Sequence, residues 1–327
     1  MTRLYRLTLR PLTPWRTPWQ ADTLIGLLLA TCARVHGPDQ LRSRLIEPML
    51  AGQPPFVLSD AMPGDLLPLP ISLRLADWPV EQRKRLKKAR WLRRKDFQSA
   101  CAGKCPPIGA LFSDAGVFTD HARQHNTLSR LNDTTDSSTE DDAIGIYQRR
   151  ETFFHSQTPE MDRRLDLYIR LLDRSAGDLL LELLYELSLT GFGADVSTGR
   201  GGFDLPDDPV AVPELDDPPP EADAIVCLST FQPSPDDPTN GYWDAFPKFG
   251  RIGPDFGLED VRKNTLILFR PGAVFRTDPA TSFLGHAVPM EKLLPSDSAD
   301  FLSTREIHII HPAFGLTIPA RLANFGD

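Results

Sequence analysis

The stretch Gly191-Phe-Gly-Ala-Asp-Val-Ser-Thr-Gly-Arg-Gly-Gly-Phe203 is the most informative in the chain, because it places five glycines directly after an apolar helical pattern. That helix is predicted over Ser175 to Leu189, where leucines fall on one face. Glycine permits positive φ and close backbone approach, so consecutive N–H groups of the loop are expected to form a nest that binds an anion. Arg200 and the hydroxyls of Ser197 and Thr198 add donors. A helix C-cap followed by a tight turn is the simpler alternative.

Strands and helices alternate on the amino-terminal side of this loop. Leu4 to Arg10 has the alternation of a half-buried strand with basic side chains on one face, and Ala21 to His36 has the spacing of a helix. Further strands are predicted at Phe56 to Ser59, Arg164 to Leu172 and Gly202 to Leu205. The order strand, helix, strand, strand, helix, strand is that of a ferredoxin-like domain.

The carboxyl-terminal side has a different pattern. The acidic, proline-rich run Asp204 to Asp223 lacks apolar periodicity, so it is predicted to bury no core and to act as a linker. Strands are predicted beyond it at Ala224 to Thr230, Thr265 to Phe269 and Glu306 to Ile310, with almost no helix between them. The expected organisation is a domain at 1–205 with a basic helical and hairpin insertion at about 79–150, an acidic linker at 206–223, and a sheet-rich domain at 224–327.

The insertion is predicted to begin with a strongly basic helix over Pro79 to Ala100. Its run Arg83 to Lys95 holds nine cations in thirteen residues. Such a run is typical of a solvated helix face, and a contact with RNA or a partner subunit is the alternative. The polar tract Asn132 to Asp142 is predicted to be a loop or hairpin tip.

The distribution of charge is more informative than its total. The chain has 36 basic and 44 acidic side chains, a net charge of −8, which by itself argues against a nucleic-acid binder. Residues 1–150 hold 22 basic and 15 acidic side chains, and the remainder hold 14 and 29, so the two parts carry +7 and −15. The 31 prolines argue against a helical bundle or coiled coil.

No segment predicts a membrane span or a disulfide framework. The longest uncharged apolar stretch, Thr23 to Ala33, is shorter than the roughly 20 residues that a spanning helix needs, and no signal peptide precedes it. The protein is therefore expected to be cytoplasmic and to have no membrane partner. Reduced thiols are expected for the four scattered cysteines, Cys32, Cys101, Cys105 and Cys227.

The glycine loop closely resembles that of the RAMP superfamily, the repeat-associated CRISPR RNA-binding proteins. Other stretches resemble motifs of the same superfamily in the same order. They are ADTLIGLL at 21–28, PFVLSDAMP at 55–63, HNTLSRLNDTT at 125–135, LDLYIR at 165–170, FRPGAVF at 269–275 and HPAFGLTIP at 311–319. Thr135 is followed by an acidic Ser/Thr tract where the family has Gly, and Ala273 stands where it often has Ser. Together the motifs resemble the Csm-type, type III-A effector subunit that caps the 5′ handle of CRISPR RNA.

The resemblance implies an α+β protein of two ferredoxin-like (RRM-like) domains, the second reduced in helix and mostly antiparallel sheet. It implies a non-catalytic subunit without metal or cofactor that grips the 5′ tag of CRISPR RNA, docks the large nucleotide-cyclase subunit and a backbone RAMP subunit, and meets target RNA indirectly. Nests, cations and aromatic rings are the groups that hold single-stranded RNA. The expected RNA-binding residues are Arg10, Trp15, Arg16, Ser59, Asp60, His125, Asn126, Arg130, Gly191, Gly193, Ser197, Thr198, Gly199, Arg200, Gly201 and Gly202.

Other functions stay open at this point. A metal-independent endoribonuclease that matures CRISPR RNA would use His36 or His125 as general acid or base, although His36 also suits a helix C-terminus. Asp133 is a candidate for RNA cleavage of the kind that backbone subunits perform. A nucleotide-binding enzyme built on the glycine loop would lack a Walker or dinucleotide motif. The pairs Cys101/Cys105 and His121/His125 have nearly the spacing of a Cys2His2 zinc site.

Overall fold

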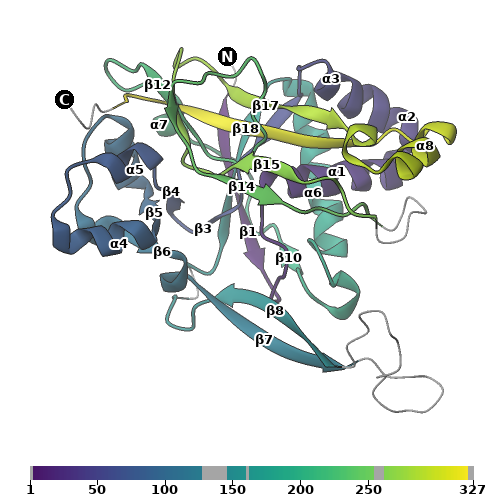
Figure 1. Cartoon of the computed structure of the whole chain (residues 1–327), viewed down its shortest axis with the longest axis horizontal. Helices are drawn as coiled ribbons and strands as arrows, with labels where there is room; N and C mark the ends of the chain where they lie inside the picture. The colour runs from purple at the N-terminus through teal and green to yellow at the C-terminus, as the bar shows by residue number, and fades with distance from the viewer. Residues whose placement is uncertain (1–2, 127–145, 160–161, 254–260, 323–327) are drawn as a thin grey trace.

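The computed structural model describes residues 3–126, 146–159, 162–253 and 261–322 (Figure 1). Every strand pairing within these ranges is antiparallel. The chain is thus a mixed α and β protein with mostly antiparallel sheets, which confirms the expected class at this level.

The first sheet contains the strands around which the amino-terminal part is built. Its order is β10-β1-β9-β2, while β11 pairs with β1 and β3 pairs with β9. The strands are β1 (Leu4–Pro11), β2 (Phe56–Leu58), β3 (Met62–Pro63), β9 (Leu165–Leu171), β10 (Phe203–Asp204) and β11 (Val210–Ala211). β9 lies between β1 and β2, and six of its residues are buried on both faces.

Two apolar helices complete the core of this part. Helices α1 (Ala21–His36) and α6 (Gly177–Thr190) bury leucines in the same cluster as Leu7 and Leu9 of β1. The elements β1, α1, β2, β9, α6 and β10 follow one another in the order predicted from the sequence. Their apolar spacing is local, which is why it could be recognised.

The second sheet dominates the carboxyl-terminal part and has the order β13-β16-β12-β18-β17. Its strands are β12 (Ala224–Cys227), β13 (Gly241–Tyr242), β16 (Val274–Arg276), β17 (Phe283–Pro289) and β18 (Ile310–Ala320). A two-stranded ribbon, β14 (Ala245–Lys248) and β15 (Leu266–Phe269), and one helix, α8 (Ser296–Thr304), accompany it. The predicted strand over Glu306 to Ile310 is wrong, because the chain turns after α8, with Glu306 at a φ of 55°, before β18 begins.

The basic segment of the insertion is not one helix, contrary to the prediction. A short helix α4 (Arg83–Lys88) is followed by strand β5 (Ala89–Arg93) and then by helix α5 (Arg94–Cys101). β5 is the centre of a three-stranded sheet with β4 (Leu66–Pro68) and β6 (Leu111–Ser113), where Leu92 pairs with Leu67 and Leu111. Pairing with strands distant in sequence overrides the local helical tendency. We call residues 80–113 the basic lobe.

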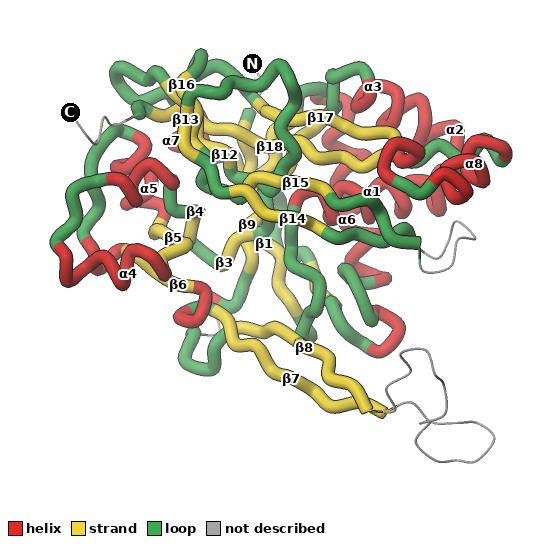
Figure 2. Tube along the Cα trace, viewed as in Figure 1, coloured by secondary structure: helices red, strands yellow, loops and turns green. Residues whose placement is uncertain are grey.

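A long hairpin follows the basic lobe and extends away from the rest of the described chain (Figure 2). It consists of β7 (Phe118–Asn126) and β8 (Ile146–Phe154). The polar tract at 132–142, together with Arg130 and Asp133, lies outside the described residues.

The predicted linker is not free of core contacts. Within 206–223, helix α7 (Pro213–Asp216) follows β11, and Val212 and Leu215 are buried. Asp216 accepts a hydrogen bond from Arg170 at 2.5 Å. The prediction that this acidic run buries no apolar side chain is therefore wrong for two residues, because β11 extends the edge of the first sheet.

Shorter helices fill the remaining connections. They are α2 (Pro38–Leu41), the π-helical turn Arg42–Ile46, α3 (Glu47–Leu50) and the 3-10 turns Ile71–Leu75, Val80–Gln82, Ile108–Ala110, Asp114–Gly116, Arg174–Ala176, Val196–Thr198 and Met290–Leu293. None of the helices in the described ranges combines the length and apolar character that a membrane span needs.

Candidate nucleic-acid interface

The glycine-rich loop packs tightly against the segment between β1 and α1. Gly191 ends α6 with a φ of +91°. A Cβ atom at Gly193 would lie 2.5 Å from the side chain of Thr17, and one at Gly201 would lie 2.0 Å from the carbonyl oxygen of Phe192. Both residues also have positive φ, so only glycine fits these two positions.

Several backbone N–H groups of the loop bind the protein itself. The N–H of Gly201 donates to the carbonyl of Pro14 at 2.9 Å, and that of Gly202 donates to the hydroxyl of Thr13 at 2.8 Å. The prediction of an open anion-binding nest is therefore wrong at these two glycines, whose N–H groups hold the loop against the segment before α1. Its exposed tip is 196–199, which contains the predicted Ser197, Thr198 and Gly199.

The cations around the loop are paired with carboxylates. Asp195 accepts hydrogen bonds from Arg16 and from Arg149, the latter at 2.7 Å, and Arg200 donates to Glu151 at 2.8 Å. Burial opposes ionisation of Asp195, but the hydrogen bond from Arg16 and the charges of Arg16 and Arg149 bring its pKa below the ordinary value. The positive charges predicted for RNA at this loop are thus largely compensated within the chain.

The basic face of β1 is compensated in the same way. Arg10 donates to Asp204 at 3.0 Å, and Arg6 lies 3.6 Å from the buried carboxylate of Asp166. Burial raises the pKa of Asp166, although the charges of nearby arginines oppose this. This face of the first sheet therefore offers little uncompensated charge.

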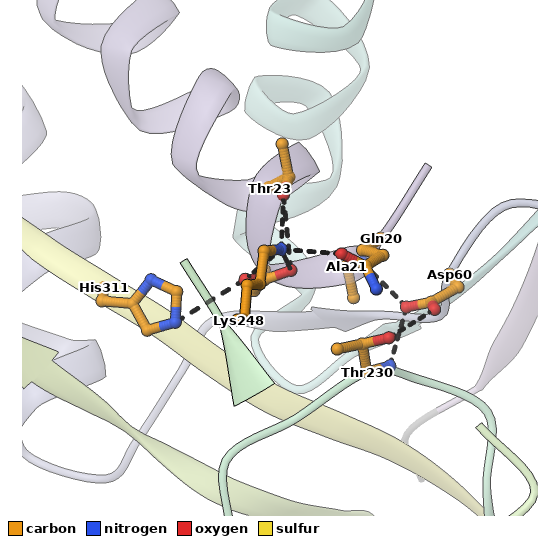
Figure 3. Close-up of polar contacts among 8 residues, drawn as sticks. Gln20, Ala21, Thr23, Asp60, Thr230, Lys248 and His311 are labelled. Carbon is orange, nitrogen blue, oxygen red and sulfur yellow. Dashed lines mark hydrogen bonds and ion pairs between the residues drawn. The ribbon is translucent and has the colours of Figure 1, made fainter. Parts of the chain in front are cut away.

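Ser59 and Asp60, which were predicted to bind RNA, form hydrogen bonds within the protein. Ser59 is fully buried, donates to the carbonyl of Asp60 at 2.6 Å and accepts the N–H of Tyr168 at 2.9 Å. The carboxylate of Asp60 accepts the N–H of Ala21 at 2.8 Å and both the N–H and hydroxyl of Thr230 at 2.7 Å (Figure 3). Asp60 thus caps α1 and joins it to the carboxyl-terminal part. Burial raises its pKa to about 6 against the effect of these hydrogen bonds.

A second polar cluster, which we call the latch, lies beside this cap (Figure 3). Lys248 of β14 donates to Asp22 at 2.7 Å, to Gln20 at 2.8 Å and to the hydroxyl of Thr23 at 2.9 Å. His311 of β18 lies 3.6 Å from Asp22. Burial, reinforced by neighbouring lysine charges, lowers the pKa of His311 to about 4. The latch residues are Asp22, Lys248 and His311.

A cavity of about 310 Å³ lies where the segment before α1, the insertion and the carboxyl-terminal part meet. Three of the predicted residues, Trp15, Arg16 and Asp60, line it. Aromatic rings and arginines are unusually frequent in its wall. They are Trp15, Arg16, Trp19, Arg74, Arg90, Trp91, Phe118 and Arg270.

Three arginines surround a single carboxylate in this cavity. Arg74 and Arg90 each lie 3.8 Å from Asp244, and Arg270 lies 3.5 Å from it. Burial lowers the pKa of Arg74 below its ordinary value, and the charges of Arg90 and Arg270 add to this effect while Asp244 opposes it. One carboxylate does not balance three guanidinium groups, so the cluster attracts a further anion such as a phosphate.

Close backbone packing brings Arg270 to the arginine cluster around Asp244. Gly272 has a φ of +92°, and a Cβ there would lie 2.4 Å from the carbonyl oxygen of Leu69. The N–H of Ile71 donates to the carbonyl of Gly272 at 2.8 Å. The motif at 269–275 is therefore packed against the turn after β4, and Arg270 shares Asp244 with Arg74 and Arg90.

An exposed aromatic face adjoins the arginine cluster. Trp243 is 41% exposed and stacks nearly parallel with Phe269 at 5.4 Å and with Phe275 at 5.6 Å between ring centroids. It directly precedes Asp244 in the chain. Such a ring beside cations is suited to stacking with an unpaired base.

The predicted residues of the hairpin, His125 and Asn126, lie at the end of β7. His125 stacks on Tyr147 with ring centroids 5.5 Å apart, and Asn126 is the exposed last residue of β7. Trp15 is bound to the base of the hairpin, because its backbone N–H donates to the carbonyl of Thr152 at 3.0 Å. The structure therefore brings Trp15 and Arg16 together at the cavity and places His125 and Asn126 further along the hairpin.

The alternative sites are not assembled in the described part of the chain. No group of three His, Cys, Asp or Glu side chains there could hold a metal ion, so the Cys101, Cys105, His121 and His125 spacing forms no zinc site. Cys101 is buried on α5. His36 is the last residue of α1, the position that its alternative role requires, and its Nε2 atom also lies 3.2 Å from Glu182 of α6.

Sequence reasoning missed Arg74, Arg90, Asp244 and Arg270 as members of one cluster. Arg90 stood within the basic run and Arg270 within the motif at 269–275, but no local pattern connects them. Their approach depends on packing between segments far apart in the chain.

Comparisons with known proteins agree with this architecture. No protein-family model matches the sequence, and no curated protein matches it. A chain of a crystal structure of a Csm1-Csm4 cassette in complex with pppApA shares 18% identity at a TM-score of 0.57, with 97% of each chain covered. A chain of the Csm3-Csm4 subcomplex of the type III-A CRISPR-Cas interference complex shares 12% identity at a TM-score of 0.61, with 96% of this chain and 99% of that chain covered.

These likenesses span almost the whole chain and show that it shares its fold with a chain of type III-A CRISPR-Cas complexes. The resemblance drawn from the motifs is confirmed at the level of the fold. The particular subunit whose fold it shares is Csm4, the component common to both structures.

Proposed function

We propose that this chain is a non-catalytic, RNA-binding subunit of a type III-A CRISPR-Cas complex that grips the 5′ tag of CRISPR RNA. The observation that carries the proposal is the cavity with three arginines around Asp244 and aromatic rings in its wall. Phosphates would meet the arginines, and unpaired bases would stack on exposed rings such as Trp243.

The proposal includes two protein partners and a fold description. The large nucleotide-cyclase subunit and a backbone RAMP subunit would bind this chain, since Csm4 occurs with Csm1 and with Csm3 in the similar structures. Two ferredoxin-like domains, the second reduced in helix, would provide the scaffold. The strand order β10-β1-β9-β2 supports this description for the first domain.

The test is RNA binding by the double variant R90A/R270A. Each arginine removed should cost about 1–3 kcal/mol of binding free energy, so affinity for a tag RNA should fall at least tenfold. Fluorescence anisotropy with a labelled tag RNA measures the loss. The matched control R34A/R44A removes two exposed arginines on the α1 side and should bind normally. Equal affinities for the R90A/R270A variant and the wild type would refute the assigned role of the cavity.

The endoribonuclease alternative is tested separately with a repeat RNA. We expect no cleavage by the purified chain, because His36 is engaged with Glu182 and neither His36 nor His125 lines the cavity. Site-specific cleavage that disappears in H36A would overturn the non-catalytic assignment.

A further inference from the structure

The basic lobe presents cations that the proposed tag site does not use. The exposed cations of this lobe include Lys84, Lys87, Lys88 and Lys95. Among the described residues none of these four lysines forms an ion pair, whereas the inward-facing Arg94 lies 3.1 Å from Asp65. The lobe therefore carries a field of uncompensated positive charge.

The packing of α4 on the small sheet explains why these cations are exposed. α4 buries Leu86, while the cations at 83–85, 87 and 88 are exposed around it. Arg85 donates to the carbonyl of Leu111 at 3.2 Å, which holds the helix on the small sheet. Within the described residues, the side chains of the lysines of α4 form no such contact, and these lysines are exposed.

The lobe is continuous with the cavity through strand β5. Arg90 and Trp91 lie in the wall of the cavity, and β5 begins directly after Lys88, the last residue of α4. A strand of RNA that leaves the cavity along β5 would pass over α4. This path rests on the proposed function, whereas the charge of the lobe does not.

The composition of the surface favours RNA over a protein partner. The cores of protein–protein interfaces are depleted of lysine and enriched in aromatic side chains. In the lobe the exposed side chains are mainly cations, and Val80 is its exposed large apolar side chain. Lysine is a compact charge on a flexible stem, which suits contacts with a phosphate backbone irrespective of base sequence.

We infer that the basic lobe is a second RNA-binding surface, which holds the phosphate backbone of a single RNA strand without reading its bases. It extends the interface from the cavity over α4. The lysines Lys84, Lys87 and Lys88 contribute most of its affinity.

The experiment compares the triple variant K84Q/K87Q/K88Q with the wild type by fluorescence anisotropy over a range of salt concentrations. The probes are an oligouridine, a tag RNA and the tag RNA extended by the oligouridine. Three lost phosphate contacts should reduce the slope of log affinity against log salt by about 2 for the oligouridine and the extended RNA. The tag RNA alone should bind the variant as it binds the wild type.

The control variant R34Q/R44Q/K292Q removes the same charge from exposed positions on α1, the π-helical turn and the turn before α8 (Figure 1). It should bind all three RNAs like the wild type, and both variants should keep the wild-type melting temperature. If the tag RNA binds no more tightly than an oligouridine of equal length and all of that affinity depends on the lobe, the result would support the lobe and refute the proposed tag site. An unchanged salt slope in K84Q/K87Q/K88Q, or an equal loss in the control, would overturn the inference. Loss of co-purifying subunits with intact RNA binding would overturn it in favour of a protein contact.

Discussion

The glycine loop and the basic lobe are both rich in cations in the sequence, but they differ in whether these cations are paired with carboxylates in the structure. Around the loop, Arg16 and Arg149 share Asp195, and Arg200 is bound to Glu151. In the lobe, the lysines of α4 have no carboxylate partner among the described residues. Cation density alone therefore does not locate an RNA-binding surface.

This difference in pairing follows from the structural role of the cations in each region. The loop must hold α6 against the segment between β1 and α1, and its ion pairs contribute to that packing. The lobe is held by the apolar side chains of a small sheet, including Leu92 and Leu111, so its lysines are not needed for its structure. Charges with internal partners act in the fold, and charges without them are available to ligands.

The largest expected difference is between the effects on stability of replacing a paired lysine, Lys248, and an exposed one, Lys84. Lys248→Met leaves Asp22, whose side chain is 1% exposed, without its ion-pair partner, so the free energy of unfolding should fall by about 3 kcal/mol. Lys84→Met removes an exposed charge and should change it by less than about 0.5 kcal/mol. Urea unfolding of both variants measures the difference. Equal losses would show that the latch lysine behaves like a surface cation.

The next largest effect concerns His311 of the latch, which should make the free energy of unfolding depend on pH. Its pKa in the folded protein, about 4, lies below the ordinary 6.5, so its contribution to stability is present above pH 6.5 and is lost as the pH falls towards 4. Between pH 7 and pH 5 this loss should be about 2 kcal/mol. Asp60, with its pKa raised to about 6, has the opposite effect in the same range.

The variant H311Q isolates the histidine contribution from that of Asp60. Its unfolding free energy should fall by about 2 kcal/mol less than that of the wild type between pH 7 and pH 5. Urea unfolding at both pH values provides the measurement. Parallel pH profiles for the two proteins would contradict the burial of a neutral His311.

The smallest expected effect comes from a substitution that removes the carboxylate partner of the loop cations, so that they become unpaired like the lysines of the lobe. Asp195→Asn keeps a side chain that tolerates the left-handed backbone at this position, where φ is 64°. It removes the charge that Arg16 and Arg149 share, so the affinity for an oligouridine should rise several-fold and the salt slope should steepen by about 1. Anisotropy titrations at several salt concentrations measure both. An unchanged slope would mean that these arginines do not reach RNA even when released.

Local patterns predicted the parts of this fold that local sequence controls. The apolar spacing of α1 and α6 and the glycines at 193 and 201 were recognisable, because each depends on neighbours in the chain or on a backbone that only glycine adopts. The motif at 269–275 was also recognised, and it does carry a cavity residue, Arg270.

The remaining features depend on contacts that no window of sequence contains. The basic run looked like one helix because β4 and β6, which turn its middle into a strand, come from other segments. Asp195 is 179 residues from Arg16, so the neutralisation of that cation was not predictable. Ser59 and Asp60 have polar side chains, and only the packed structure shows that their partners are internal.

The position of β18 in the chain has a consequence for how this protein folds during its synthesis. β18 pairs with β12 and β17, its Thr317 carbonyl accepts a hydrogen bond from Arg170 at 3.0 Å, and its His311 lies at the start of α1. The amino-terminal core therefore stays open on one side until this last described strand emerges from the ribosome. Contacts between such distant segments slow folding and leave apolar surface exposed meanwhile. Timely translation of the carboxyl-terminal part is thus a condition for a soluble nascent chain.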